Sequence, residues 1–175
     1  HQAIPRGHYD RIWLESMVFL VALHFVAAAT SPVLVRVLDR RAFFVLALAP
    51  AISFGWLLSP QLWPTADEPT YQRFAWLPEI ELNLDFALNP LSAVLALLVT
   101  GVGTLVLIYC AWYFRPNDPD IWRFSGVLTA FAGAMLGLVL ADNIYLLYIF
   151  WEITTVLSFL LIGHPERRAN RRAAM

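Results

Sequence analysis

Long apolar runs constrain this chain more than any other feature of its sequence. The clearest run extends from Ile144 to Gly163 and contains one charged residue, Glu152. About 20 apolar residues in a helix, at ~1.5 Å each, span the hydrocarbon core of a bilayer. The mean hydropathy is +0.62, and charged residues make up 14% of the chain, against roughly 25% in soluble domains. We therefore predict an integral membrane protein.

The order of apolar and polar segments predicts an all-α membrane domain over residues 17–175, preceded by a polar N-terminal segment over residues 1–16. About five transmembrane helices are expected, and they cover residues 17–35, 42–59, 90–114, 124–141 and 144–163. Pro50 lies at the centre of the second helix and predicts a kink there. The last arginines are followed by Ala173 and Ala174, which is typical of the segment just before another membrane helix. We therefore expect a chain truncated at its C-terminus.

The longest polar segment lies between the second and third expected helices. Apolar residues occupy the even positions from Leu82 to Leu88, and this period of two is typical of a short β-strand. We expect the strand to form a hairpin with residues 71–76 over the membrane surface. The Asn89-Pro90 pair that follows is typical of a helix N-cap and first turn, and it predicts that the third helix starts at Pro90.

The fourth expected helix carries small residues at four-residue spacing. Such residues let helix backbones approach closely, and close packing is the main source of association where lipid removes the hydrophobic drive. We predict that these residues form a helix-packing face with no chemical role. The face consists of Gly126, Ala130, Gly133, Ala134 and Gly137.

Glu152 is the leading candidate for a functional residue. It lies about 15 Å along the helix from Asp142, near the expected bilayer centre, where an ionised side chain costs about 2.5 to 3.5 kcal/mol on insertion scales and usually faces the bundle interior or a hydrated path. Thr155 shares its face and Ser158 is adjacent, and these hydroxyls either bind the carboxylate or bind only their own backbone. The alternative interpretation is a protonated acid that makes one interhelical hydrogen bond.

Two further residues are secondary candidates. His24 is the only ionisable residue in the first expected helix, and it is either a second protonatable site or a neutral histidine bonded to a neighbouring helix, which we favour. Asp142 precedes the fifth helix and is expected to be a cap near water. The sequence contains no recognisable nucleophile with its base and no metal-ligand cluster, so no enzyme activity, cofactor or metal is predicted. The formal net charge of -1 argues against a nucleic-acid partner.

The distribution of the twelve basic residues, all of them arginine, predicts the orientation. One side of the predicted membrane carries three: Arg6, Arg11 and Arg73. The other side carries nine: Arg36, Arg40, Arg41, Arg115, Arg123, Arg167, Arg168, Arg171 and Arg172. The positive-inside rule places the second side, including the C-terminal arginine cluster, in the cytoplasm and the N-terminus outside.

Several stretches resemble a known family. Residues 137–143 (GLVLADN), residues 150–164 (FWEITTVLSFLLIGH) and the arginine pattern of residues 167–172 are similar to the start of the large A-type component of Mrp sodium/proton antiporters. That component is similar to the proton-pumping subunit 5 of respiratory complex I. The resemblance covers about residues 17–175 and is strongest from Gly137 onward. The sequence departs from the family pattern at Asn89-Pro90, where Asp-Gly is the familiar pair.

The resemblance implies the N-terminal portion of a Na⁺/proton antiporter subunit in a bacterial inner membrane. Other subunits of a hetero-oligomeric complex and the bilayer are then its partners, Na⁺ and H⁺ are the transported ions, and the protein is a transporter subunit. The family glutamate that matches Glu152 transfers protons and pairs with a lysine on a later helix, whereas this chain contains no lysine.

Two alternatives stay open. One is a proton-translocating subunit of a respiratory NADH dehydrogenase, although the Ile-Thr-Thr sequence after Glu152 favours the antiporter, since the complex I relatives more often have a glycine-containing sequence there. The other is a truncated membrane packing or assembly module that performs no transport of its own.

Overall fold

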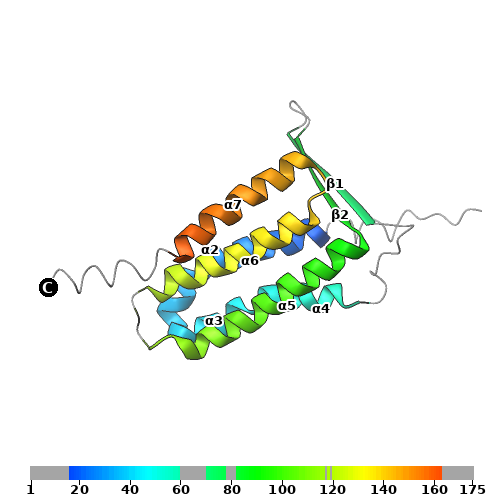
Figure 1. Ribbon diagram of the computed structural model, residues 1–175. Helices are drawn as coiled ribbons and strands as arrows, with labels where there is room; N and C mark the ends of the chain where they lie inside the picture. The colour runs from blue at the N-terminus through cyan, green and yellow to red at the C-terminus, as the bar shows by residue number, and fades with distance from the viewer. Residues whose placement is uncertain (1–15, 60–69, 78–81, 117, 119, 163–175) are drawn as a thin grey trace, which may run out of the picture.

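The computed structural model describes residues 16–59, 70–77, 82–116, 118 and 120–162. They form a bundle of helices with a two-stranded sheet at one end (Figure 1). The elements in chain order are α2 (Ser16–Leu38), η1 (Asp39–Arg41), α3 (Ala42–Leu46), α4 (Leu48–Leu57), β1 (Thr70–Leu77), β2 (Leu82–Leu88), α5 (Pro90–Tyr113), α6 (Ile121–Leu140) and α7 (Ile144–Ile162).

Four helical stretches within the described residues are long and apolar enough to cross a membrane. They are Met17–Leu57, Pro90–Tyr113, Ile121–Leu140 and Ile144–Ile162. The first has 41 residues and contains both of the first two helices expected from the sequence. The prediction of several apolar helices of membrane-spanning length is therefore confirmed.

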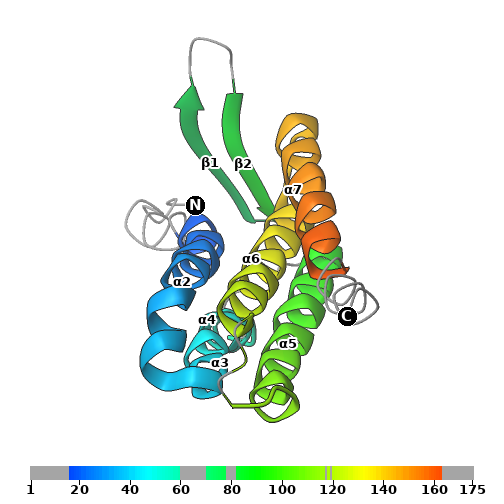
Figure 2. The same cartoon turned by 90° about the vertical axis from the view of Figure 1, so that its left-hand side faces the viewer.

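The first stretch turns back on itself at η1. Asp39 has a φ of 52°, which is the left-handed region that aspartate tolerates better than most residues. Beyond this turn, α3 and α4 run back alongside α2 (Figures 1 and 2). The helix breaks between α3 and α4 because Pro50 has no N–H to donate to the carbonyl of Leu46, one turn earlier.

The start of α5 matches its prediction. The Asn89 side chain accepts a hydrogen bond from the Ser92 N–H at 2.9 Å, and Ser92 Oγ accepts one from the Asn89 N–H at 2.8 Å. This reciprocal pair is a capping box, with Pro90 at the first helical position. The backbone N–H groups of Asn89 and Ser92 have no carbonyl four residues earlier in the helix, and the capping box gives both of them a hydrogen-bond acceptor.

The two strands pair antiparallel, with a register that runs from Thr70 opposite Leu88 to Leu77 opposite Leu82. The strand expected at Leu82–Leu88 is present, and its partner includes the expected residues 71–76. That this sheet lies over a membrane surface stays a prediction.

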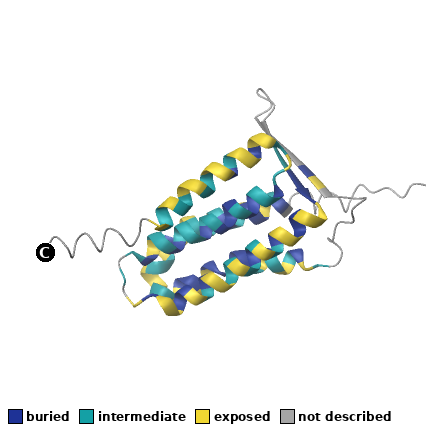
Figure 3. Cartoon of the chain, viewed as in Figure 1, coloured by how far each residue is buried: buried dark blue, intermediate teal, exposed yellow. Residues whose placement is uncertain are grey.

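Two buried clusters hold the bundle together. One lies at the sheet end, where Phe86 and Leu88 of β2 pack with Leu136, Leu140 and Phe150 of the last two helices. The other lies at the opposite end, where Phe43 stacks on Phe114 with ring centroids 5.6 Å apart. Exposed residues, yellow in Figure 3, lie along the outer faces of the helices. Many of them are large and hydrophobic. Helices that are apolar all round are typical of membrane segments.

Candidate functional site

Glu152 lies on an outward-facing side of α7. It is eight residues from the start of the helix, or about 12 Å, and its side chain is exposed among the described residues. The Tyr148 side chain, one helical turn earlier, lies on the same face of α7 as the Glu152 carboxylate. The carboxylate is therefore absent from the interior of the described bundle, where such residues commonly lie.

The orientation of α7 explains why Glu152 points outward. Gly137 of α6 lies directly against the Phe150 ring, and a Cβ at this position would overlap the ring. Phe150 and Leu146 are the buried residues of α7. Because each residue advances the helix by about 100°, Glu152 lies about 200° around the axis from Phe150. Burial of Phe150 therefore fixes the outward direction of the carboxylate.

The neighbouring hydroxyls bind their own helix. Thr155 Oγ1 donates to the Trp151 carbonyl at 3.0 Å, and Ser158 Oγ donates to the Thr155 carbonyl at 2.9 Å. Of the two possibilities that the sequence left open, the structure has backbone bonding. The side chain that accompanies Glu152 on its face is instead Tyr148, which the i, i+4 spacing in the sequence was sufficient to indicate.

His24 is fully buried in the first helix. Its Nδ1 donates to the Leu20 carbonyl of the same helix at 2.8 Å, which fixes the tautomer because a carbonyl only accepts. Its Nε2 has no hydrogen-bond partner among the described residues. The expected bond to a neighbouring helix is thus replaced by a bond within α2. The His24 side chain instead packs against Gly133 of α6, which leaves little room beside the ring.

The small residues of α6 face two different helices. A Cβ at Gly133 would lie 2.5 Å from His24 Cβ, and one at Gly126 would lie 2.5 Å from Ser31 Oγ, both on α2. Gly137 faces α7, Ala134 is fully buried and Ala130 is half-buried. As Figure 2 shows, α6 lies between α2 and α7. The packing role predicted for this face stays a prediction, and substitution tests it directly.

Asn143, rather than Asp142, caps α7. Asn143 Oδ1 accepts from the Leu146 N–H at 2.7 Å, whereas the Asp142 side chain is exposed. The expectation of a cap at Asp142 is therefore wrong by one residue, because the helix starts at Ile144 and its cap is the residue immediately before it. The backbone N–H of Asp142 donates to the Asp85 carbonyl in β2 at 2.8 Å.

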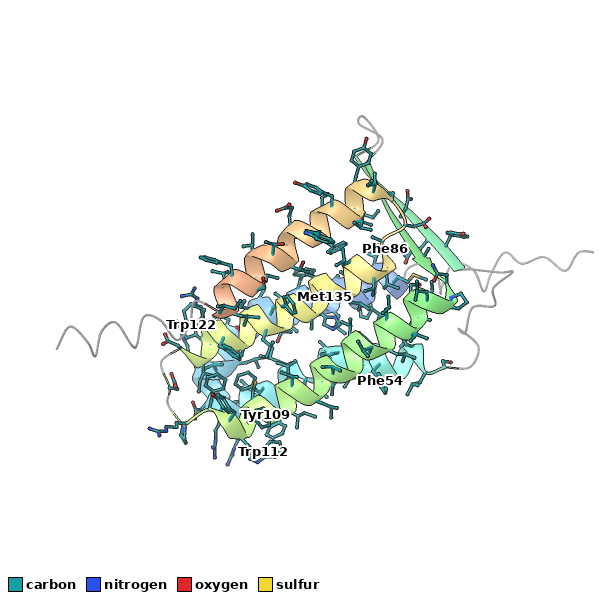
Figure 4. The ribbon with its side chains drawn as sticks, in the orientation of Figure 1. Phe54, Phe86, Tyr109, Trp112, Trp122 and Met135 are labelled. Carbon is teal, nitrogen blue, oxygen red and sulfur yellow. The ribbon has the colours of Figure 1, made fainter. Side chains whose placement is uncertain are left out.

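The candidate residues do not form one cluster. Glu152 is associated with Tyr148 and His24 with Gly133, and α6 lies between the helices that carry Glu152 and His24. Figure 4 marks the two ends of the bundle with Phe86 near the sheet and Trp122 near the α5–α6 turn. Within the described ranges, no group of three or more His, Cys, Asp or Glu residues is placed to hold a metal ion.

Comparisons with known proteins show what this chain is similar to. Residues 76–125 match the family described as NADH-ubiquinone oxidoreductase (complex I), chain 5 N-terminus. The chain is 37% identical over 153 residues to the A1 component of a Na⁺/H⁺ antiporter of Staphylococcus haemolyticus (strain JCSC1435), a match that covers 86% of this chain and 19% of that protein. It is 39% identical over 102 residues to the A/B component of a probable K⁺/H⁺ antiporter of Rhizobium meliloti (strain 1021), covering 58% of this chain and 10% of that protein.

A solved structure agrees with these sequence matches. The structure of the Mrp complex from Dietzia sp. DQ12-45-1b contains a chain that is similar with a TM-score of 0.74 and 32% identity, over 84% of this chain and 16% of that chain. The chain thus spans about a fifth or less of the length of these relatives. Together the matches show that the chain is similar to the A1 component of a Na⁺/H⁺ antiporter, to a chain of the Mrp complex and, over residues 76–125, to the N-terminal domain of complex I chain 5.

Proposed function

We propose that this chain works as the N-terminal portion of a cation/proton antiporter subunit, in which Glu152 relays protons. The observation that carries the proposal is the position of one carboxylate about 12 Å into α7. Glu152 is the only acidic residue in α5, α6 and α7. An acid at such depth is costly and is most often functional. The relatives named as components of Na⁺/H⁺ and K⁺/H⁺ antiporters support this assignment.

In the proposed mechanism Glu152 alternates between a protonated and an ionised state. We propose that the Tyr148 hydroxyl, one turn earlier on the same face, donates to the carboxylate while it is ionised and orients it. A proton passes to or from this carboxylate when a donor or acceptor atom comes within about 2.6 to 3.2 Å, directly or through one water. The cationic partner implied by the family resemblance belongs to another segment of the antiporter, since none of these 175 residues is a lysine.

The proposal includes an orientation and a number of crossings. The described arginines at η1 and around the α5–α6 turn all lie at the end of the bundle opposite the sheet (Figure 2). They are Arg36, Arg40, Arg41, Arg115 and Arg123. By the positive-inside rule this end faces the cytoplasm of a bacterial cell and the sheet faces outward. The reversal at η1 makes Met17–Leu57 cross twice, for five crossings in total.

Substitution of Glu152 in the assembled antiporter complex tests the relay. Glu152→Gln keeps a hydrogen-bonding group of the same size but cannot titrate, so cation-driven proton flux into vesicles should fall to the background of empty lipid. Glu152→Asp should be intermediate, because the carboxylate moves by about one bond. If Glu152 is instead a protonated acid with a structural role only, Glu152→Gln should keep near-normal flux, because glutamine also donates a hydrogen bond. Near-normal flux in Glu152→Gln, at equal assembled protein, would reject the relay.

The match to complex I chain 5 supports a second candidate, which is a proton-translocating subunit of a respiratory dehydrogenase. The same vesicles separate the two functions. An antiporter moves protons when a Na⁺ or K⁺ gradient is imposed, whereas a dehydrogenase subunit moves them only during NADH oxidation.

A further inference from the structure

The two-stranded sheet is bonded to three helices at the same end of the bundle. Gln72 Oε1 in β1 accepts from the Val18 N–H of α2 at 3.3 Å. The Ala87 carbonyl in β2 accepts from Ser92 Oγ of α5 at 3.1 Å. The Asp85 carbonyl accepts from the Asp142 N–H, just before α7, at 2.8 Å. The sheet therefore links the N-terminal ends of helices that are far apart in sequence.

Asp85 makes a second bond to the α6–α7 turn through its side chain. Its Oδ2 accepts from Asn143 Nδ2 at 3.3 Å, across 58 residues of sequence. The same Asn143 side chain uses its oxygen to cap α7 through the Leu146 N–H. One amide thus joins the sheet to the first turn of α7. An isolated bridge between Phe86 and Ala141 lies beside this contact and fixes the two backbones together.

The residue after Asp85 acts on the rotation of α7. The Phe86 and Phe150 rings have centroids 6.2 Å apart, and Phe150 lies in the space left by Gly137. Asp85 therefore fixes where α7 begins, and Phe86 helps to fix which way it faces. Since Glu152 is two residues after Phe150, both contacts determine the position of its carboxylate.

We propose that β2 positions Glu152 for proton transfer and that Asp85, through Asn143, is the principal positioning residue. The inference rests on the proposed relay function of Glu152. Helix Cα atoms lie about 2.3 Å from the axis and a glutamate carboxylate lies several Å further out, so a rotation of ~10° moves the carboxylate by roughly 1 Å. A misplacement of about 1 Å can slow a reaction by up to about 100-fold.

Exchange of the two side chains provides a specific test in the assembled complex. Asn143→Asp keeps an oxygen for the Leu146 N–H but places a second carboxylate against Asp85, so this variant should lose the link and keep the cap. Asp85→Ala should lose the link as well. The double variant Asp85→Asn with Asn143→Asp restores an amide–carboxylate bond with the roles reversed. Tyr71→Ala, which changes an exposed side chain of the same sheet, is the matched control.

Two readouts are measured for each variant. The first is the antiport rate as a function of cation concentration. The second is the distance between spin labels at Val94 of α5 and Phe159 of α7, both exposed, in a Cys110→Ala background. We expect Asp85→Ala and Asn143→Asp to slow maximal antiport by about 10- to 100-fold with little change in half-saturating cation concentration. The label distance should shift or broaden. The double variant should recover both properties, and Tyr71→Ala should match the wild type.

The outcomes separate this proposal from the relay itself. If Glu152→Gln is inactive but Asp85→Ala and Asn143→Asp leave both rate and label distance unchanged, the positioning role is refuted and the relay stands. If Glu152→Gln is active while the label distance still shifts in Asp85→Ala, the relay fails. Should Asp85→Ala not assemble, the comparison of Asn143→Asp with the double variant decides, and failure of the double variant to recover either property counts against the proposal.

Discussion

Replacement of Gly133 with alanine tests how closely α2 and α6 approach each other. The added Cβ would lie 2.5 Å from His24 Cβ and 3.3 Å from His24 Cγ. Carbon atoms normally pack at about 3.5 to 4.0 Å, so the helices must separate by roughly 1 Å. The nearest atom is the Cβ of His24, which moves only with its backbone, and a new rotamer therefore gives no relief. Overpacking of this kind costs about 1 to 3 kcal/mol.

The helix propensity of alanine opposes this cost and must be measured separately. Alanine is more favourable than glycine by about 1 kcal/mol inside a helix. Gly55 of α4 is the matched control, because a Cβ there would have no atom within 4 Å. We expect Gly55→Ala to stabilise the protein by up to about 1 kcal/mol and Gly133→Ala to destabilise it by about 0 to 2 kcal/mol. The two variants should therefore differ by about 1 to 3 kcal/mol.

Reversible unfolding in mixed micelles measures this difference. Two further variants test whether the His24 Cβ is the atom in contact. His24→Ala retains this Cβ and should not restore the stability lost in Gly133→Ala. His24→Gly removes the Cβ and should restore part of that stability, once the effect of His24→Gly alone has been subtracted. Equal stabilities of Gly133→Ala and Gly55→Ala would show that the two helices are not in close contact at Gly133.

Two other predictions address the cap and the orientation. Asn89→Ala removes the side-chain acceptor for the Ser92 N–H and should destabilise the protein by about 1 kcal/mol in the same unfolding assay. Asn89→Asp keeps an acceptor oxygen and should retain most of the stability. Equal losses of stability in the two variants would exclude the cap as the cause. In a Cys110-free protein in intact cells, an impermeant thiol reagent should modify a cysteine at Asp142, at the sheet end, and miss one at Pro116, near the arginines. The reverse labelling pattern would overturn the proposed orientation.

Local signals in the sequence predicted local structure well. The Asn89-Pro90 pair defined the start of α5 because the capping box depends on residues only three apart. The apolar runs indicated the membrane-crossing stretches, since length and hydropathy alone define them. Pro50 predicted an irregularity, and the break appears one turn earlier, at the carbonyl that its missing N–H leaves unbonded.

Features that depend on distant residues were not predictable in the same way. The bond between Asp85 and Asn143 joins positions 58 residues apart, and no sequence pattern around either residue predicts that the two are in contact. The outward direction of Glu152 was equally hidden, because a carboxylate in a membrane helix usually faces the bundle interior or a hydrated path, whereas Glu152 and Thr155 share an exposed face of α7. Only the fit of Phe150 against Gly137 decides that face.

The burial of α7 has a mechanical consequence. Its two buried residues, Leu146 and Phe150, lie in the first two turns, and every later residue up to Ile162 is half-buried or exposed among the described residues. The helix is thus held most firmly at its sheet end, and beyond Phe150 it packs on the core through the partly buried Ile153 and Leu157. A tilt of α7 by ~5° about its first residue, Ile144, displaces Glu152, about 12 Å away, by roughly 1 Å. The same tilt displaces Ile162, about 27 Å away, by more than about 2 Å. A small tilt of α7 at its sheet end therefore gives a displacement that increases along the helix, and the Glu152 carboxylate lies a little less than halfway along it.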